Sequence, residues 1–304
     1  MATSTARESG AGDAAEREPV LDELGAHVSV AGGVDLAPGR ACDIRSVNLQ
    51  LFTKQPNRWA EPKRRADRVA RFREEREARG IRTAVSHDSY LINLATPDEA
   101  LWERSLASFR AELERCVDLG LDFVVTHPGN ATDGEADSGA ERNAAAVTRA
   151  LEEVPGETRV LLELTAGSGT SIGGSFEALA AIRERIPEPL RARVGICFDT
   201  CHAYSAGYDL AGDYDGVWRR FDGVLGLERL ELFHLNDSKH PRGSHKDRHE
   251  HIGQGTLGEE PFRRIMTDAR FTDVPKLLET PKGDDMVTED LRNLGQLRAF
   301  RRGG

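Results

Sequence analysis

The sequence is poor in cysteine and in long apolar runs, and each shortage excludes a class of protein. Four cysteines among 304 residues are too few and too scattered for a disulfide framework, so we expect reduced thiols and a cytoplasmic location. No stretch approaches the roughly 18 consecutive apolar residues of a transmembrane helix, so we expect no membrane partner. Residues 1–20 lack the apolar segment of a secretory signal, and their low hydrophobicity predicts a disordered tail.

Lysine is also scarce, and the net charge of −10 is unfavourable for a polyanionic partner. Affinity for DNA that does not depend on sequence comes from lysine and arginine on phosphates. A cluster of bound divalent cations would nevertheless reverse the local field in one cleft. Two of the few lysines, Lys54 and Lys239, follow apolar strand-like runs, which makes them individually interesting.

Eight strand-like apolar runs end on polar side chains, and seven of them end on a residue type that binds metals. The eighth run ends on Lys54, and the seven others end, in chain order, on His27, His87, His127, Glu163, Asp199, His234 and Glu279. Folding alone gives no reason to place such side chains at the tips of the most apolar segments. Strands that point their last residue into a shared pocket would give one.

The spacing of these runs predicts an α/β protein with a (β/α)8 TIM barrel. The run ends span residues 27 to 279, which is 252 residues in seven steps or about 36 each, and a strand–helix–strand unit needs roughly 30 or more. Helical patterns lie between the runs, one opening at Thr96–Glu99 and closing at Gly120, and others opening at Ser138 and Ser175. Continuously apolar runs are typical of parallel strands buried on both faces.

A doubly wound open sheet is the alternative fold. In such a sheet the ligand-type residues would gather near one switch point, whereas the C-terminal ends of all barrel strands converge on one face. Because these residues end nearly every run, we predict a barrel with a metal site at the C-terminal face of its strands. We expect residues 21–300 to form this single domain.

Imidazole and carboxylate groups without thiolates are typical of catalytic zinc, manganese or iron sites. One mononuclear site cannot use seven side chains, so two or more metals are expected. His202, three residues after Asp199, could join Asp247 and His249 in a third site, with a solvated charged loop as the alternative for the last two. Multinuclear sites hydrolyse phosphate esters, and metal-dependent sugar isomerisation on the same barrel stays open.

At several motifs the chain resembles the endonuclease IV family of abasic-site DNA repair enzymes. The motifs follow the family order over about residues 24–281, and they include Gly25-Ala-His-Val-Ser29, Leu51-Phe-Thr-Lys54, His87-Asp-Ser-Tyr-Leu-Ile-Asn-Leu94, His127-Pro-Gly129, Asp199-Thr-Cys-His202, Ala206-Gly-Tyr-Asp-Leu210, His234-Leu-Asn-Asp-Ser-Lys239, Asp247-Arg-His249 and Leu278-Glu-Thr280. The resemblance implies a trinuclear zinc barrel that cleaves the phosphodiester 5′ to an abasic site. The products would carry a 3′-hydroxyl and a 5′-deoxyribose phosphate.

The resemblance also implies a role for each metal-ligand residue. The three ligand sets are His87, His127 and Glu163; a bridging Glu163 with Asp199, His234 and Glu279; and His202, Asp247 and His249. A hydroxide between the first two zinc ions would attack phosphorus, the third would stabilise the leaving oxygen, and Glu279 would orient the nucleophile. Manganese or iron is an alternative at one or more sites. His27 is not a ligand in the family, so it either supports the ligands by hydrogen bonding or simply packs.

Duplex DNA with abasic sites is the partner that the resemblance implies, and we expect the protein to act as a monomer. The expected DNA-binding residues are Lys54, Arg58, Trp59, Tyr90, Leu91, Asn236, Lys239 and Arg248. Loop packing is the alternative for Trp59 and Tyr90, and a catalytically silent lesion binder is an alternative function. The chain departs from the family at Asn57-Arg58, where many members carry Arg then Gln, and at Leu164, where Asn is usual. These departures put the geometry of lesion recognition in question.

Overall fold

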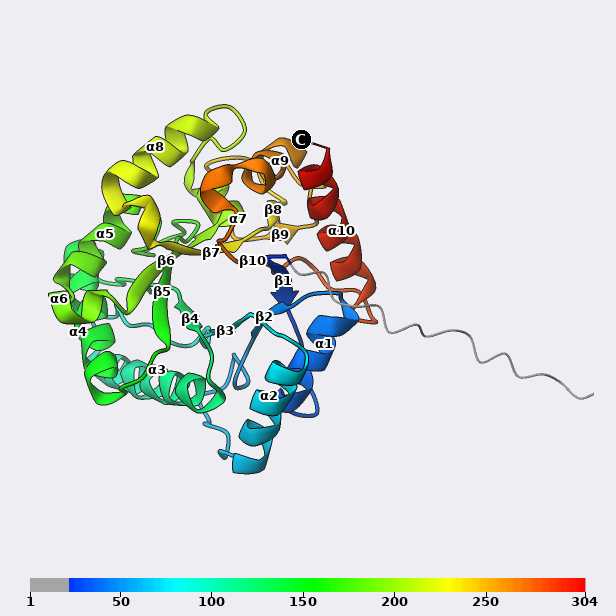
Figure 1. Ribbon diagram of the computed structural model, residues 1–304. Coiled ribbons are helices and arrows are strands. Elements are labelled where there is room, and N and C mark those ends of the chain that lie inside the picture. Colours follow the sequence, from blue (N-terminus) through cyan, green and yellow to red (C-terminus); the bar gives the residue numbers. More distant parts are fainter. Residues whose placement is uncertain (1–21, 304) are drawn as a thin grey trace, which may run out of the picture.

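A computed structural model describes residues 22–303, and the predicted tail at residues 1–20 lies outside these described residues. Eight parallel strands close into a barrel in the order β1-β10-β7-β6-β5-β4-β3-β2 (Figure 1). The strands are β1 (Leu24–His27), β2 (Asn48–Leu51), β3 (Thr83–His87), β4 (Phe123–Thr126), β5 (Arg159–Glu163), β6 (Val194–Asp199), β7 (Leu230–His234) and β10 (Lys276–Leu278). The predicted TIM barrel is confirmed.

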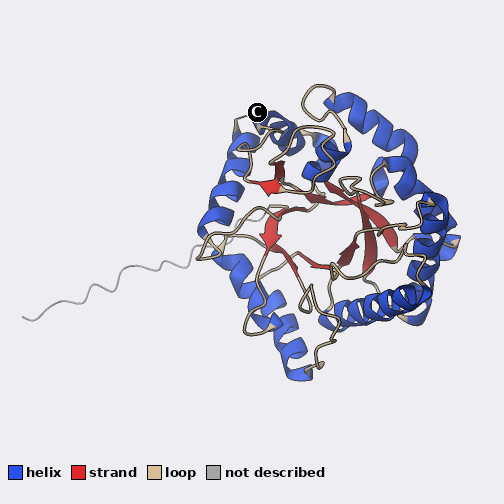
Figure 2. Cartoon of the chain, turned by 180° about the vertical axis from the view of Figure 1, so that it is seen from behind, coloured by secondary structure: helices blue, strands red, loops and turns tan. Residues whose placement is uncertain are grey.

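Helices form an outer ring around this barrel (Figure 2). They are α1 (Ala37–Asp43), α2 (Ala66–Ala78), α3 (Glu99–Leu119), α4 (Ala136–Glu153), α5 (Phe176–Arg185), α6 (Glu188–Arg191), α7 (Thr200–Ala206), α8 (Tyr214–Leu225), α9 (Glu259–Thr267) and α10 (Thr288–Arg302). After β7, the short antiparallel strands β8 (Asp237–Ser238) and β9 (His249–Glu250) form a separate pair. Among the described residues, no helix is long and apolar enough to cross a membrane.

The N-cap of helix α3 lies two residues later than the predicted one at Thr96. Its N-cap is Asp98, whose carboxylate accepts a hydrogen bond from the amide of Leu101 at 2.9 Å. Thr96 instead accepts from the amide of Asp98 within the preceding turn. A carboxylate at the N-cap satisfies an otherwise unpaired amide and favours the positive end of the helix dipole, which explains the later start. Gly120 closes the helix with a φ of 69°, as predicted.

The barrel interior is built in two layers. The lower layer is a fully buried cluster, the apolar floor, made of Val85, Val125, Leu161, Cys197, Leu232 and Leu277. Because side chains alternate along a strand, the residue two positions further on points to the same side. Two positions beyond each floor residue stand, in the same order, His87, His127, Glu163, Asp199, His234 and Glu279.

The other two strands follow the same offset with different residues. Two positions beyond Gly25 on β1 stands His27, and two positions beyond Asn48 on β2 stands Gln50. The register of β1 and β2 pairs Gly25 with Asn48 and His27 with Gln50. His27, Gln50 and the six residues above the floor therefore form one ring at the C-terminal end of the barrel, which we call the polar ring.

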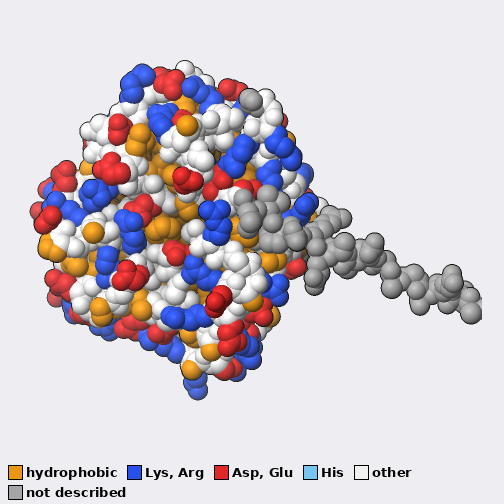
Figure 3. Space-filling view, in the orientation of Figure 1, with side chains coloured by type: hydrophobic (Ala, Val, Ile, Leu, Met, Phe, Trp, Pro, Cys, Tyr) orange, Lys and Arg blue, Asp and Glu red, His pale blue; other side chains and the backbone are white. Residues whose placement is uncertain are grey.

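Acidic and basic side chains are interspersed over the outer surface on the face seen in Figure 3. Many exposed arginines of the described residues pair with neighbouring carboxylates, as Arg64 does with Asp118 and Arg110 with Glu153. Such exposed pairs contribute about 0–1 kcal/mol each to stability. They do, however, neutralise these arginines, so cations that meet DNA are better sought in the loops around the barrel mouth.

Candidate metal centre

Among the described residues, five groups of possible metal ligands are found near the C-terminal end of the barrel; two of them include Cys197 or Cys201, and three consist of histidines and carboxylates alone. The last three are His87, His127 and Glu163; Glu163, Asp199, His234 and Glu279; and His202, Asp247 and His249. Within each group, one donor atom from every residue lies within 4.8 Å of the others. The structure thus brings together the three predicted ligand sets, and Glu163 belongs to two of them. That these groups hold metal ions stays a prediction, which the following contacts support.

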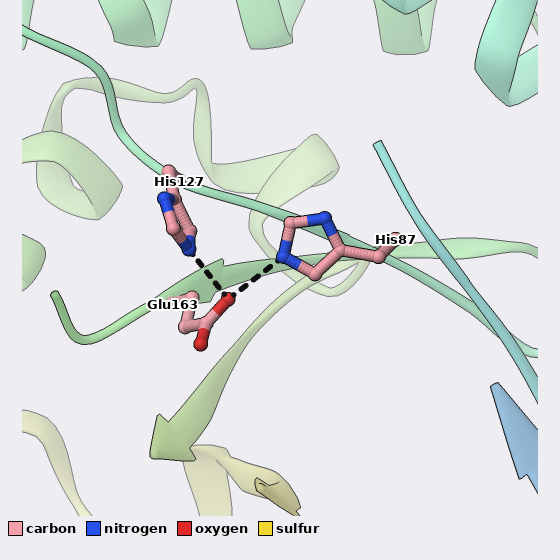
Figure 4. A group of neighbouring side chains, drawn as sticks. All are labelled: His87, His127 and Glu163. Atoms are coloured by element: carbon pink, nitrogen blue, oxygen red, sulfur yellow. Dashed lines mark hydrogen bonds and ion pairs between the residues drawn. The ribbon is translucent and has the colours of Figure 1, made fainter. Parts of the chain in front are cut away.

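Glu163 is the centre of the arrangement and is fully buried at the end of β5. One carboxylate oxygen, Oε2, lies 3.1 Å from Nε2 of His87 and 3.1 Å from Nε2 of His127 (Figure 4). The other, Oε1, lies 3.1 Å from Nδ1 of His234 and 3.2 Å from Nδ1 of His202. Burial would raise the pKa of Glu163, but the imidazoles of His234 and His127 outweigh it and hold that pKa well below its usual range.

Asp199 connects the second group to the third, because it is both the last residue of β6 and the N-cap of helix α7. Its Oδ1 accepts a hydrogen bond from the amide of His202 at 2.7 Å, which caps the helix and places the His202 ring over the barrel mouth. Its Oδ2 accepts from the amide side chain of Asn236 at 2.7 Å and lies 3.7 Å from Nε2 of His249. One carboxylate therefore serves both the local helix start and the centre.

Four of the imidazoles are oriented by hydrogen bonds made at the nitrogen opposite the predicted metal-binding one. The bonds run from Nδ1 of His87 to the Asp88 carbonyl (3.0 Å), from Nδ1 of His202 to the Leu164 carbonyl (2.9 Å), from Nδ1 of His249 to the Glu279 carbonyl (3.2 Å) and from Nε2 of His234 to Oε1 of Gln50 (2.8 Å). Metal-binding histidines almost always bond their other nitrogen in this way, which fixes the ring and its tautomer.

The contacts of the third group support the prediction that its residues hold an ion. Nε2 of His202 and Nε2 of His249 are buried, and within residues 22–303 neither has a hydrogen-bond partner. Both atoms face the carboxylate of Asp247 at 3.2 Å. Burial would raise the pKa of Asp247, but the two imidazoles lower it far below its usual range. Two unpaired nitrogens beside an ionised carboxylate are costly to bury alone, and they match the nitrogen and oxygen ligands of zinc.

The departure at Leu164 leaves this geometry intact. The Leu164 side chain is fully buried, and its backbone carbonyl accepts the hydrogen bond from His202. This contact requires no particular side chain at position 164. The family's usual amide is therefore dispensable for holding His202.

A cleft of about 780 Å³ opens onto the centre. Its walls come from the loops after β1, β2, β3, β7 and β10, and they include Phe52, Tyr90 and Met286. Tyr90 is 66% exposed at the mouth and packs edge-on against Phe52, with 5.4 Å between ring centroids. Two of the three large apolar side chains that are exposed among the described residues, Tyr90 and Met286, line this cleft, so they are well placed to contact a ligand.

Five of the other predicted DNA-binding residues differ in how accessible they are. Arg58, Lys239 and Arg248 are exposed, whereas Leu91 and Trp59 are half-buried. The Trp59 ring lies under the guanidinium of Arg104, 4.4 Å from the ring centroid, so loop packing accounts for its position.

Lys54 and Asn236 are placed differently from what a DNA contact requires. Lys54 is buried, and its ammonium donates to Glu61 at 2.7 Å and to Ser108 at 2.9 Å. Asn236 is fully buried, and besides holding Asp199 it accepts a hydrogen bond from the amide of Glu279 at 2.8 Å. Both placements favour a supporting role, for Lys54 in the loop after β2 and for Asn236 in the centre.

Replacing Lys54 by methionine should destabilise the protein by about 1–3 kcal/mol, because Glu61 and Ser108 would lose a buried donor. The salt dependence of DNA binding should stay unchanged, since the ammonium does not face solvent. Chemical denaturation and binding at several salt concentrations would measure both. Lys63→Met, an exposed lysine in the same loop, is the matched control for stability. A Lys54→Met protein of normal stability with a weaker salt dependence would instead show a phosphate contact.

Gln50 and His27 form a hydrogen-bonded pair at the edge of the centre. Nε2 of Gln50 lies 3.1 Å from Nδ1 of His27, and burial lowers the pKa of His27 to about 3. His27 is therefore neutral at physiological pH, and its contact with Gln50 favours the first of the two expected roles, which stays a prediction. Gln50 was not identified from the sequence. Its position two residues beyond Asn48 on a buried strand is the signal that could have shown that it faces the predicted ligands.

Comparison with known proteins gives a consistent family. Residues 40–297 match the family described as "Xylose isomerase-like TIM barrel". A protein of Geobacter sulfurreducens named "Probable endonuclease 4" is 50% identical over 281 residues, covering 91% of this chain and 94% of that protein. The crystal structure of endonuclease IV from Thermus thermophilus superposes with a TM-score of 0.82 at 38% identity, covering 92% of this chain and 99% of that one.

A D-tagatose 3-epimerase-like protein shares the fold alone, with a TM-score of 0.66 at 16% identity over 92% of this chain and 98% of that one. The barrel is thus common to enzymes of different chemistry, and the barrel by itself does not separate a nuclease from an epimerase. The curated relative and the Thermus structure do separate them, because their similarity extends along the whole barrel at much higher identity. The chain belongs to the endonuclease IV family.

Proposed function

We propose that the protein is a DNA repair endonuclease that hydrolyses the phosphodiester bond 5′ to an abasic site in duplex DNA. The products would carry a 3′-hydroxyl and a 5′-deoxyribose phosphate. The observation that carries this proposal is the complete third group, His202, Asp247 and His249, beside the two groups that share Glu163. A sugar isomerase on this barrel has no evident use for a third group.

The residues present would hold three zinc ions, with manganese or iron as alternatives. Two ions would be held by the groups that share Glu163, and the third by His202, Asp247 and His249. Such ions lower the pKa of bound water and neutralise charge that develops on phosphate oxygens. The apolar floor closes the barrel beneath the centre, so substrate and water reach these residues from the cleft side.

Glu279 is suited to orient the attacking water. Its side chain is 16% exposed, and its backbone amide is held by Asn236. Burial would raise the pKa of Glu279, but His234 outweighs it and lowers that pKa to about 2. The carboxylate is therefore ionised at neutral pH and accepts hydrogen bonds, which favours an orienting role over proton storage.

The loops around the cleft would recognise the lesion. An abasic nucleotide must leave the base stack to reach groups at the bottom of a cleft, and a side chain must then fill the gap. Tyr90 presents an exposed ring at the mouth, and stacking on such a ring contributes about 1–3 kcal/mol per base. The exposed Arg58, Lys239 and Arg248 would meet phosphates.

One chain supplies every residue of the centre, so we propose that the protein acts as a monomer. We also propose that residues 21–300 form one domain. In support, strands from β1 to β10 close a single barrel, and helix α10 packs beside β1 (Figure 1).

Incubation of metal-replete protein with duplex DNA that bears a single abasic analogue tests the proposed function. We expect cleavage on the 5′ side of the analogue and a 3′-hydroxyl on the upstream product. Undamaged duplex of the same sequence is the control and should stay intact. Intact abasic DNA despite three bound metal ions would contradict the proposal, and tight binding without cleavage would identify a silent lesion binder.

Arg58→Ala should weaken DNA binding and lower the salt slope by about 0.9, the value expected for one phosphate contact. The physical reason is that Arg58 is an exposed cation in the loop after β2. Binding of an uncleavable abasic duplex at increasing salt would measure the slope. Arg64→Ala is the matched control, because Arg64 already pairs with Glu114 and Asp118 and should leave the slope unchanged. Equal slopes for wild-type protein and Arg58→Ala would exclude the contact.

A further inference from the structure

We propose that Gln50 is a positioning residue that fixes the tautomer of His234 and the orientation of Glu279, and that it thereby sets the metal affinity of their group. The inference rests on the proposed metal centre and goes beyond it, because Gln50 is not itself a predicted ligand. It belongs to the polar ring, yet it carries an amide where six of the eight members carry predicted ligand groups. Its side chain is fully buried, so the amide needs partners within the protein.

The amide of Gln50 bridges two side chains of one group. Its Oε1 lies 2.8 Å from Nε2 of His234, and its Nε2 donates a short hydrogen bond to Oε1 of Glu279. The third contact is the one with Nδ1 of His27 at 3.1 Å. The two N–H groups of Gln50 thus bond to Glu279 and His27, and its carbonyl oxygen bonds to His234. Because every polar group has a partner, burying this amide costs little free energy.

The direction of each hydrogen bond follows from the chemistry of Glu279. Nε2 of Gln50 donates to Oε1 of Glu279, and a carboxylate that binds a metal ion can only accept, so the NH2 group of Gln50 is on the side of Glu279. The carbonyl oxygen of Gln50 then faces His234 and can only accept, so Nε2 of His234 must carry the proton. An imidazole that binds a metal ion is neutral and has one proton, so in the metal-bound protein Nδ1 is left with its lone pair.

That lone pair points where an ion is expected. Nδ1 of His234 lies 3.1 Å from Oε1 of Glu163 and 3.3 Å from Oε2 of Glu279. The opposite tautomer would place a proton between these oxygens and would leave Gln50 without a donor. Gln50 therefore selects the form of His234 that can bind a metal, and it restrains the Glu279 carboxylate at the same time.

Gln50 differs from the groups that orient the other histidines. His87, His202 and His249 bond to backbone carbonyls, which persist whatever the local side chains are. The tautomer of His234 instead depends on a side chain of β2. One substitution can therefore remove this control without changing any predicted ligand.

Gln50→Leu tests the inference in the full-length protein by zinc binding rather than by cleavage. Zinc release to a competing chromophoric chelator, with elemental analysis, would give the number and affinity of the bound ions. We expect one zinc ion to be lost about 10–100-fold more readily than in the wild-type protein, the usual effect of removing such a partner. The ions held mainly by the other groups should be retained. In histidine nitrogen NMR spectra, His234 should lose its uniform Nε2–H form.

Gln50→Glu separates the two roles and also serves if the leucine variant does not fold. A carboxylate can still accept from His234, so its tautomer should be preserved. It cannot donate to Glu279, and repulsion between the carboxylates should weaken zinc binding. Asn48→Leu is the matched control, since it removes a buried amide from the lower layer of the same strand, where Asn48 bonds the Asp22 carbonyl. It should lower thermal stability but leave zinc affinity unchanged.

The outcomes that overturn the inference are distinct from those that overturn the proposed function. Wild-type zinc affinity in Gln50→Leu and Gln50→Glu, or an Nδ1–H form of His234 in the zinc-loaded wild-type protein, would remove Gln50 from the positioning role alone. A wild-type protein that binds no zinc would overturn both proposals. Zinc bound normally without cleavage of abasic DNA would overturn the function and leave the role of Gln50 in place.

Discussion

Glu163→Ala should lose at least one bound metal ion and nearly all cleavage of abasic DNA. Glu163 touches two of the three ligand groups and lies about 3.1 Å from imidazoles on three different strands or strand ends. Catalytic metal ions contribute several kcal/mol to stabilisation of the transition state, and about 4 kcal/mol corresponds to roughly a thousandfold in rate. We therefore expect kcat to fall by about a thousandfold or more.

Single-turnover cleavage, together with elemental analysis of the purified variant, would measure both losses. Glu231→Ala is a suitable control because Glu231 is also a carboxylate on a barrel strand. It pairs with Arg159 instead of the histidines, so its loss should affect stability but not metal content. A Glu163→Ala protein with a full set of metals and normal kcat would remove Glu163 from the bridging role.

Stripping the metals should make the stability of the protein fall as the pH rises from about 6.5 to about 10. In the metal-free protein, protons on the imidazoles take over the neutralisation of the buried carboxylates. Burial would lower the pKa of His87 and of His249, but carboxylates such as Glu163 and Asp199 raise these values to about 10 and about 9. An unfolded histidine has a pKa of about 6.5.

The sign of the effect follows from these values. Below about pH 6.5 both folded and unfolded histidines are protonated, and the stabilisation is fully present. As the pH rises through the folded values of about 9 and 10, His87 and His249 lose their protons and the stabilisation disappears. Metal binding requires the neutral ring, so metal uptake near pH 7.5 should release protons and become tighter at higher pH.

Thermal denaturation of chelator-treated and zinc-loaded protein between pH 6 and 10 would test this prediction. The two curves should diverge as the pH rises, with the metal-free protein losing stability and the loaded protein retaining it. Calorimetric zinc titrations in buffers of different ionisation enthalpy would count the released protons. A metal-free protein whose stability does not change over this range would show that these imidazoles do not pair with carboxylates as described.

The barrel and the strand ends were predictable from the sequence because both depend on short-range patterns. Runs such as Val160-Leu-Leu-Glu163 are apolar up to a polar last residue, and their spacing leaves room for one helix each. Helix α2 had no such signal. Most of its 13 residues are charged, and only Phe72 is buried. No apolar stripe therefore repeats along the helix to indicate it in the sequence.

The strand run toward Lys54 shows why local patterns fail for individual roles. The apolar run continues through Phe52, but β2 ends at Leu51, three residues before the expected end. The polar side chain that belongs to the ring is Gln50, and Lys54 turns back into the protein toward Glu61 and Ser108. Ser108 lies 54 residues away in the sequence, so no local pattern reveals that the lysine is already paired.

The three ligand groups were reached in two different ways. The six ring positions above the apolar floor follow from the strand-end pattern, because alternation along each strand dictates which side chains point inward. The grouping of His202 with Asp247 and His249 was predicted from their positions after two strand ends, and the family resemblance added the bridging place of Glu163. Loop geometry places Asp247 and His249: the β8–β9 pairing brings the chain back over the barrel mouth at His249.

The offset of two residues between the apolar floor and the polar ring also bears on how barrels of this kind diversify. A point substitution in the ring alters the chemistry at the mouth while six buried side chains beneath continue to hold the strands together. Insertion of a single residue between the two layers of a strand would turn its ring side chain outward toward the helices and point an apolar neighbour into the barrel mouth. New reactions are therefore accessible by substitution alone, whereas changes of length are confined to the connecting loops.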